Sequence, residues 1–496
     1  MSDTSADVKA LTGISGLDDV LQGGLSRGHM FLLEGEPGAG KTTIAIQFLL
    51  EGARCGERCL YISLSETEEE LRQTIASHGW TLPDSVVIHE LAPPDGALAD
   101  EKRQSLLHSA DLELGETTRQ IFEAVDRVKP DRIVLDSLSE IRLLAQSSLR
   151  YRRQILAIKH YFSRQHVTVL FLDDLTGETG DKTVHSIAHG VIRLEEIAPD
   201  YGAGRRRLRI SKYRAQHYRG GYHDFVIKRG GVHVYPRLVA LEHHTRYERT
   251  KLSTGNRAFD SLLGGGVEKG SSTLILGPAG TGKSLIALSF AIAAMKRGQR
   301  VAMFAFDEEI DLLFDRTHAL DMDLEKFIED GFLFIEQVDA AQVTPGEFAY
   351  RARELVDSNG ITEVIIDSIN GYRAAMPEEN SLILHMHELL QYLNRRGAST
   401  FMTVAQHGIV GTMDAPVDIT YLADTVILLR YFEAAGEVRR AVSVVKKRAG
   451  MHETTIREFT IGAGGIKVGE PLSAFTGVLA GVPTFTGDSL PPPKRT

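Results

Sequence analysis

The sequence contains the same eight-residue phosphate loop twice, and this repeat limits what the chain can fold into. The pattern G-x-x-x-x-G-K-[ST] fits residues 35–42 and again residues 277–284. Each loop follows a short apolar run, at 30–33 and 273–276, and precedes residues with helical apolar spacing. A strand, a loop and a helix in this order form the context in which the pattern binds a nucleotide. The chain is therefore predicted to hold two nucleotide sites.

The residue types of both loops suit phosphates and magnesium. Glycines let backbone N–H groups wrap the phosphates, the helix N-terminus adds partial positive charge, the lysine reaches the β- and γ-phosphates, and the hydroxyl holds Mg²⁺. A glycine-rich turn without nucleotide is the alternative, and two full matches argue against it. The predicted binding residues of the first loop are Gly35, Gly38, Gly40, Lys41, Thr42 and Thr43. Those of the second loop are Gly277, Gly280, Thr281, Gly282, Lys283, Ser284 and Leu285.

The spacing between the loops extends to the residues around them. An offset of 242 positions relates Lys41 to Lys283 and also Asp18 to Asp260. Further along the chain, the run IVLDS of the first copy is answered by VIIDS in the second. A repeat on this scale indicates a tandem duplication of one domain.

Within each copy, short apolar runs alternate with amphipathic helical patterns. This alternation is typical of an α/β fold in which helices cover both faces of a mainly parallel sheet. After each core, runs with strand periodicity and turn glycines predict antiparallel hairpins that extend the sheet, and residues 234–251 are expected to link the copies. We predict two tandem P-loop domains at residues 1–244 and 245–485, followed by a flexible proline-rich tail at 486–496.

The bulk composition is that of an ordinary soluble protein. The 496 residues carry a formal net charge of −10, which argues against a general binder of nucleic acids or anionic membranes, since both attract cationic surfaces. Only Cys55 and Cys59 are present, too few for a disulfide framework or a cysteine-based zinc site. The start of the chain lacks a basic segment followed by an apolar one, and no apolar run is long enough to span a bilayer. We therefore expect a cytoplasmic protein without a membrane anchor.

One aspartate in each copy ends an aliphatic run. These residues are Asp136 and Asp367. A buried strand would deliver such a carboxylate to the Mg²⁺ ion held by Thr42 or Ser284, so all four are predicted metal ligands. The alternative is an aspartate that caps the next turn.

Further carboxylates follow the second strand of each copy. They are Glu66 in the first copy and Asp307 and Glu308 in the second. A carboxylate there could polarise an attacking water or take the proton of a hydroxyl acceptor, because phosphoryl transfer needs mainly positioning and charge stabilisation from the protein. Acids in this place can also merely favour a helix N-terminus. We predict that these three side chains are catalytic.

A Lys-x-Arg pair recurs near the end of each copy, as Lys212 with Arg214 and Lys446 with Arg448. On a hairpin, such a pair suits a finger that stabilises the transferred phosphate of a neighbouring subunit. In the first copy the pair belongs to a basic run that begins at residues 205–207, which have no counterpart in the second. Contact with nucleic acid and a solvated strand face are the two alternatives.

Taken together, these features resemble the KaiC family of bacterial clock ATPases and autokinases. The resemblance rests on the loops GEPGAGKT and GPAGTGKS, on ISGLDDVLQGGL with its copy STGNRAFDSLLGGG, and on KKRAGMHETTIREF near the end. It covers nearly the whole chain. It implies two RecA-like domains in a double-ring homohexamer with ATP at the subunit interfaces. The first ring would hydrolyse ATP slowly, and the second would phosphorylate its own Ser or Thr.

The resemblance also assigns roles to individual residues. Glu66 and Glu308 match catalytic glutamates of the family, whereas Ser65 and Asp307 stand where the family has the first of two glutamates. The resemblance implies that ATP and Mg²⁺ are bound by Lys41, Thr42 and Asp136 in the first ring and by Lys283, Ser284 and Asp367 in the second.

The family's two adjacent phosphoacceptors align with Thr420 and Tyr421, so Thr420 is the predicted phosphoacceptor. The resemblance further implies a KaiB-like or two-component signalling partner. Two alternatives stay open, a regulatory double-ring ATPase switch without kinase activity and a RecA-like DNA-dependent ATPase. The acidity of the chain argues against the second alternative.

Overall fold

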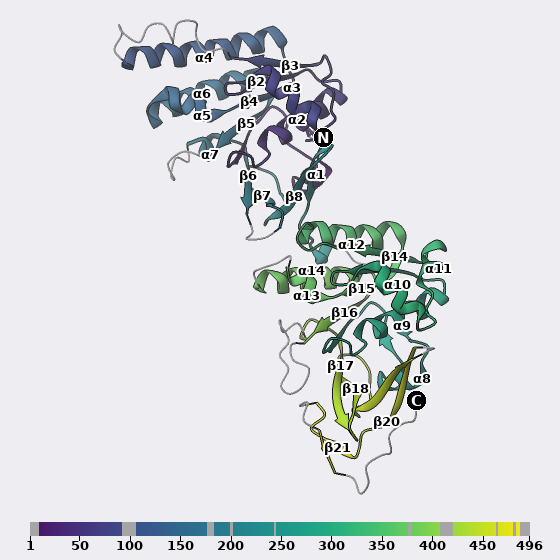
Figure 1. The fold of residues 1–496 in the computed structure, drawn as a ribbon. Coiled ribbons are helices and arrows are strands. Elements are labelled where there is room, and N and C mark those ends of the chain that lie inside the picture. Colours follow the sequence, from purple (N-terminus) through teal and green to yellow (C-terminus); the bar gives the residue numbers. More distant parts are fainter. Residues whose placement is uncertain are drawn as a thin grey trace, which may run out of the picture. The chain divides into compact units, whose positions relative to one another are not determined.

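The chain folds into two compact units, Met1–Arg237 and Leu238–Thr496, in a computed structural model. The structure describes residues 9–91, 106–175, 183–198, 202–242, 245–374, 379–406, 420–462, 465–479 and 483–486. Figure 1 shows that each unit is a sheet covered by helices. The boundary between the units falls a few residues before the predicted domain boundary at 244. The predicted proline-rich tail lies, apart from Thr486, outside the described residues.

The first unit contains a nine-stranded sheet in the order β3-β2-β4-β5-β1-β6-β7-β8-β9, parallel as far as β6 and antiparallel beyond it. Its strands are β1 Met30–Gly35, β2 Cys59–Ser63, β3 Val86–Glu90, β4 Arg132–Asp136, β5 Thr168–Asp174, β6 Gly190–Ile197, β7 Arg205–Tyr213, β8 His223–Lys228 and β9 Gly231–Tyr235. Its helices are α1 Ser15–Val20, α2 Lys41–Arg54, α3 Glu68–Ser77, α4 Leu106–Val128, α5 Leu138–Ala145, α6 Ser148–Arg164 and α7 Thr183–Ile187.

The second unit repeats this sheet in the order β14-β13-β15-β16-β12-β17-β18-β19-β20 and adds two short strand pairs. Its strands are β10 Lys251–Leu252, β11 Val267–Glu268, β12 Ser272–Gly277, β13 Arg300–Ala305, β14 Leu333–Gln337, β15 Ile361–Asp367, β16 Ser399–Ala405, β17 Thr425–Ala434, β18 Glu437–Lys447, β19 Arg457–Gly462, β20 Gly465–Pro471, β21 Phe475–Thr476 and β22 Thr484–Phe485. Its helices are η1 Ala240–Glu242, α8 Arg257–Leu262, α9 Lys283–Lys296, α10 Ile310–His318, α11 Leu324–Glu329, α12 Pro345–Asn359, α13 Ile369–Ala374 and α14 Glu379–Arg395.

Alternate residues of the central strands enter opposite cores. In β1, Leu33 packs with α1, α2 and α3, whereas Leu32 packs with α4, α5, α6 and α7. In β12, Ile275 packs with α8 to α11 and Leu276 with α12 to α14. A strand buried on both faces must be apolar at successive positions, which explains the unbroken apolar runs of the sequence. This packing fixes the two strands from which the phosphate loops start.

The predicted α/β fold with a mainly parallel sheet and an antiparallel extension is confirmed in both units. The last strand of each sheet, β9 or β20, was not predicted. The linker predicted from residue 234 is wrong at its start, because Val234 and Tyr235 are buried and pair with β8. Pro236 directly after this short edge strand makes it read as a linker. Among the described residues, no helix combines the length and the apolar character needed to cross a membrane.

Two helical glycines of the first unit predict opposite effects on stability. A Cβ on Gly16 of α1 would lie 1.9 Å from the carbonyl oxygen of Val234, whereas a Cβ on Gly115 of α4 would meet nothing within 4 Å. We expect Gly16→Ala to lower the free energy of unfolding by about 1–3 kcal/mol. Gly115→Ala should raise it by about 0.5–1 kcal/mol, because alanine restricts the unfolded chain more.

Urea unfolding followed by tryptophan fluorescence would measure both effects, since Trp80 is the single tryptophan of the chain and belongs to the first unit. Equal shifts of the midpoint in the two variants would contradict the close approach of α1 to β9.

Candidate nucleotide-binding sites

Each phosphate loop turns from the end of a buried strand into the first residue of a helix. Gly40 precedes α2 and Gly282 precedes α9, with φ angles of 100° and 103° that favour glycine. A Cβ on Gly38 would meet nothing within 4 Å, so the middle of the first loop has room for a ligand. Both helices are 14 residues long and direct free backbone N–H groups at the loops. This geometry fits the phosphates of a nucleotide.

Lys41 of the first loop is held by three oxygen atoms. Its Nζ donates to the carbonyl oxygens of Gly35 and Glu36, both at 2.9 Å. It also lies 2.7 Å from Oδ1 of Asp174, the last residue of β5. Phosphates in this loop would therefore compete with a carboxylate for the ammonium group.

Lys283 of the second loop has a different environment. Its Nζ donates to the carbonyl oxygen of Pro278 at 2.8 Å. Burial lowers the pKa of Lys283, while the negative charge of Asp367 acts in the opposite direction. The strand register puts Ala405 where the first unit has Asp174. The second loop thus lacks the carboxylate that pairs with the lysine of the first.

Asp136 ends β4 beside the first loop. The hydroxyl of Tyr61 in β2 donates to Oδ2 of Asp136 at 2.5 Å, and the hydroxyl of Thr42 also hydrogen-bonds this carboxylate. Burial raises the pKa of Asp136, and these hydrogen bonds and the charge of Lys41 act against that rise. A loop hydroxyl in contact with a strand carboxylate supplies the oxygen ligands that Mg²⁺ prefers. Thr42 and Asp136 therefore fit the metal of a nucleotide complex.

Asp367 ends β15 in the same position of the second unit but has a different donor. The hydroxyl of Thr403 in β16 donates to Oδ1 of Asp367. Met303 occupies the position in β13 that Tyr61 holds in β2, and its thioether has no hydrogen to donate. The two aspartates are therefore oriented from opposite neighbouring strands.

Glu66 lies just after β2 and near Asp136. Burial raises the pKa of Glu66, and the charges of Asp136, Glu70 and Asp174 raise it further. Among the described residues, Oε2 of Glu66 is buried without a hydrogen-bond partner. A carboxylate with a free oxygen in this position is suited to accept a proton from water.

The corresponding acids of the second unit are engaged by other side chains. Asp307 is exposed and accepts a hydrogen bond from the hydroxyl of Ser368. Glu308 pairs with Arg316, whose Nη2 lies 2.9 Å from its Oε2. Burial raises the pKa of Glu308, the charge of Arg316 lowers it, and that of Asp367 raises it. Catalytic roles for these acids stay predictions.

The predicted phosphoacceptor and the predicted finger of the second unit contact each other. Lys446 Nζ donates to the carbonyl oxygen of Thr420 at 2.8 Å. Arg448 Nη2 donates to the carbonyl oxygen of Tyr421 at 2.5 Å. Tyr421 is 49% exposed, so this turn is accessible from outside the chain.

This turn lies at the edge of the sheet opposite the phosphate loop. Asp424 ties it to the first residue of β12, because its Oδ2 accepts from the backbone N–H of Ser272 at 3.0 Å. The loop starts from Gly277, the last residue of the same strand. Five steps of about 3.3 Å separate these two residues, so about 16 Å lies between the two edges.

The first unit repeats the arrangement of the finger residues. Lys212 Nζ donates to the carbonyl oxygen of Ala188 at 2.8 Å, and Arg214 Nη2 to that of Ser186 at 2.7 Å. The Lys-x-Arg pair thus hydrogen-bonds the segment that precedes β6 in the first unit and the segment that precedes β17 in the second. A finger role toward a neighbour stays a prediction.

The basic run of β7 is paired with acids of β6. Arg207 Nη2 lies 2.9 Å from Glu195 Oε2, and Arg206 Nη2 lies 3.0 Å from Glu196 Oε1. These cross-strand pairs neutralise much of the run. The arrangement favours a structural role for the run over contact with nucleic acid.

Several residues of these sites were not predicted from the sequence, among them Asp174, Tyr61 and Thr403. Asp174 carried a signal, because it follows an apolar run much as Asp136 does. Tyr61 and Thr403 carried none, since each looks like an ordinary strand residue until the neighbouring strand is known.

Comparison with known proteins identifies relatives over nearly the whole chain. The sequence model of the KaiC ATPase family matches residues 10–239 and again residues 252–473. The circadian clock protein KaiC3 of Synechocystis sp. is 27% identical, with 98% of this chain and 97% of the relative aligned. The circadian clock oscillator protein KaiC of Acaryochloris marina is 26% identical over 96% of this chain and 91% of its own length.

The separate donors to the two aspartates predict separate effects on magnesium-dependent ATP binding. Tyr61→Phe should weaken it about 10-fold in the first unit only, and Thr403→Val should do so in the second only, because an unsupported carboxylate holds a metal less well. To measure one unit alone, the lysine of the other loop would be replaced, by Lys283→Ala or by Lys41→Ala. ATP would then be titrated into each of these chains with and without Mg²⁺. An equal loss without Mg²⁺ would mean that the substitution distorts the loop instead.

Proposed function

This chain belongs to the KaiC family of ATPases, and from that premise we propose that it is an ATP-hydrolysing, self-phosphorylating homohexamer. ATP would occupy the interfaces between subunits in both halves. The first half would hydrolyse it, and the second would transfer the γ-phosphoryl group to Thr420. The state of Thr420 and of the nucleotide would then control the binding of a KaiB-like or two-component signalling partner.

Hydrolysis in the first half follows from the residues around its loop. Backbone N–H groups and Lys41 would bind the phosphates, and Thr42 with Asp136 would hold Mg²⁺, which neutralises charge on the phosphates when bound. Glu66 would accept a proton from the attacking water, for which its unpaired Oε2 is suited. The pairing of Lys41 with Asp174 supports a loop whose lysine is held in place.

The single observation that carries the kinase proposal is the distance between the two ends of β12, the central strand of the second sheet. Reacting atoms must approach to about 3–3.5 Å, whereas the Thr420 turn lies about 16 Å from the loop of its own unit. ATP bound to that loop therefore cannot reach Thr420 of the same chain. A neighbouring copy that presents its loop to this edge would bring the two together, and Lys446 and Arg448 lie at the same place.

The transfer itself would need one base and one attacking oxygen. Oγ of Thr420 would form a bond to the γ-phosphorus while the bond to the β,γ-bridging oxygen breaks and ADP leaves. The hydroxyl proton would go to Glu308 of the neighbouring copy, whose pKa is raised by burial and lowered by the charge of Arg316. Asp307 would provide a second carboxylate beside this base.

A second candidate is a double-ring ATPase switch without kinase activity. It is favoured by the hydrogen bond that ties Asp307 to Ser368 and by Tyr421, whose phenol occupies the position of a second short hydroxyl.

Label transfer from γ-labelled ATP would separate these proposals. We expect label in the wild type and none in Thr420→Ala, while ATP hydrolysis continues in both. Lys283→Ala chains keep the acceptor but lose the second loop, and Thr420→Ala chains keep the loop but lose the acceptor. Neither should be labelled alone. When the two are coexpressed with tags of different length, label should enter only the Lys283→Ala chain.

Each other outcome of this experiment excludes one part of the proposal. Hydrolysis without label in the wild type would leave the ATPase switch. Label in the wild type but none in the coexpressed pair would mean that the phosphoryl group is transferred within one chain. A neighbouring copy would then be excluded as the donor.

The raised pKa of Glu66 predicts a shifted pH dependence for hydrolysis in the first half. The base must be ionised, so the rate should fall as pH drops through a value above that of an ordinary glutamate. Glu70→Gln should move this fall to lower pH, because it removes one charge that raises the pKa of Glu66 yet preserves the capping box with Thr67. The profile would be recorded in a Lys283→Ala background. A fall that persists in Glu66→Gln would assign it to another group.

A further inference from the structure

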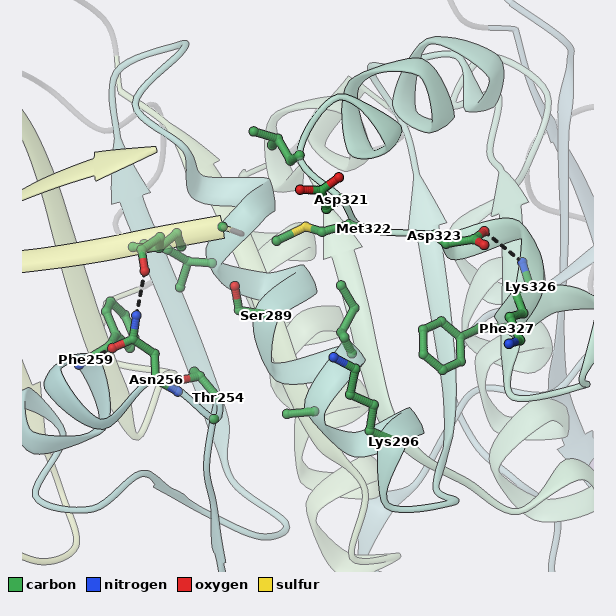
Figure 2. Close-up of a pocket in the computed structure, with 17 residues that line it drawn as sticks. Thr254, Asn256, Phe259, Ser289, Lys296, Asp321, Met322, Asp323, Lys326 and Phe327 are labelled. Atoms are coloured by element: carbon green, nitrogen blue, oxygen red, sulfur yellow. Dashed lines mark hydrogen bonds between the residues drawn. The ribbon is translucent and has the colours of Figure 1, made fainter. Parts of the chain in front are cut away.

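The second unit contains a cavity of about 690 Å³ that is separate from its phosphate loop. It lies between the outer face of α9, the segment before α8 and the connection from α10 to α11 (Figure 2). Its walls are mostly apolar, with polar side chains at a few points. The apolar walls include Phe259, Ile286, Ile292, Phe327 and Ile466. Size and lining both fall in the range of small-molecule sites, which hold about 300–1,000 Å³.

The duplication shows why the cavity exists. The offset of 242 positions aligns α9 with α2, and equivalent backbone hydrogen bonds align the turns after α10 and α3. At three aligned positions the second unit has the smaller side chain: Ser289 for Gln47, Ala293 for Glu51, and Met322 for Trp80.

The first unit fills the same space. A Cβ on Gly231 would lie 2.4 Å from the Trp80 ring and 2.6 Å from Gln47 Cδ. At the matching Gly465, a Cβ would meet only Met322 Cε, at 3.2 Å. The cavity of the second unit thus results from these smaller side chains and not from the backbone fold that the two units share.

The same substitutions leave a positive charge without its partner. In the first unit, Arg54 donates to both carboxylate oxygens of Glu51, at 2.8 and 2.6 Å. Lys296 replaces Arg54, and Ala293 replaces Glu51. No ion pair of Lys296 is formed among the described residues. Figure 2 shows its ammonium group turned into the cavity, between Ser289 and Phe327 in that view.

The acids of the cavity lie at its rim and are exposed. Asp323 is the N-cap of α11, and its Oδ1 accepts from the backbone N–H of Lys326 at 3.2 Å. Asp321 belongs to the turn above Met322 in Figure 2, away from Lys296. Lys296 is exposed as well, but Figure 2 shows its ammonium group turned into the cavity, so the charge on that side of the cavity is positive.

From these contacts we propose that the cavity is a binding site for a small anion with an apolar body, whose charged end pairs with Lys296. The apolar part would contact Phe259, Phe327 and the isoleucines. The site lies along α9, the helix that begins at Lys283, but it does not depend on hydrolysis or on phosphorylation of Thr420.

Fluorescence of anilinonaphthalene sulfonate, an apolar aromatic anion, would test the site in the full-length protein. We expect saturable binding of one molecule per chain to the wild type. Decanoate should displace it, whereas decanol and decylamine should be at least about 10-fold weaker, because only decanoate can pair with the lysine. No saturable binding, or equal displacement by all three, would overturn the proposal.

Variants taken from the first unit would locate the site. Met322→Trp should abolish binding by refilling the cavity. Ala293→Glu should weaken it about 10-fold more than Ala293→Gln, because the two side chains have the same size and only glutamate can neutralise Lys296. ATP binding by each variant would verify folding. Unchanged binding in Met322→Trp would place the probe elsewhere, and equal losses in the two Ala293 variants would exclude the role of charge.

Discussion

The direction of the central strand is the constraint on which the rest of each unit depends. A parallel strand delivers everything at its carboxyl end to one edge of the sheet and everything before its first residue to the other. In β12 this puts the loop after Gly277 at one edge and the turn of Thr420, tied to Ser272, at the other. The proposed donor site and the proposed acceptor, Thr420, therefore lie at opposite ends of the strand. The proposed transfer between them would require a second copy.

The loops, the strands that precede them and the aspartates could be predicted because each has a local pattern. The doubled pattern made both the duplication and the α/β fold visible in the sequence. The edge strands β9 and β20 were not predicted, because their alternating runs, Val232-His233-Val234 and Ile466-Lys467-Val468, are too short to distinguish a strand from a loop. Tyr61 and Thr403 were missed for a related reason: a cross-strand hydrogen bond depends on strand order, which local sequence does not encode.

The two units have one scaffold but different side chains around it. The aspartate beside the loop is supported from β2 in the first unit and from β16 in the second. The space beside the loop helix is filled by Trp80 in one unit and left open beside Met322 in the other. Backbone geometry was thus retained while the contacts that adjust a site diverged, as expected when fold and function are separable.

The ion pair between Lys41 and Asp174 gives the first unit an electrostatic linkage that is not formed in the described part of the second unit. A bound triphosphate would bring several negative charges beside Asp174 and would share its lysine. That change favours the uptake of another cation beside Asp174. Nucleotide binding in the first unit would then be coupled to the concentration of salt. In the second unit, Ala405 removes this coupling, so the two halves of one chain would respond differently to the same solution.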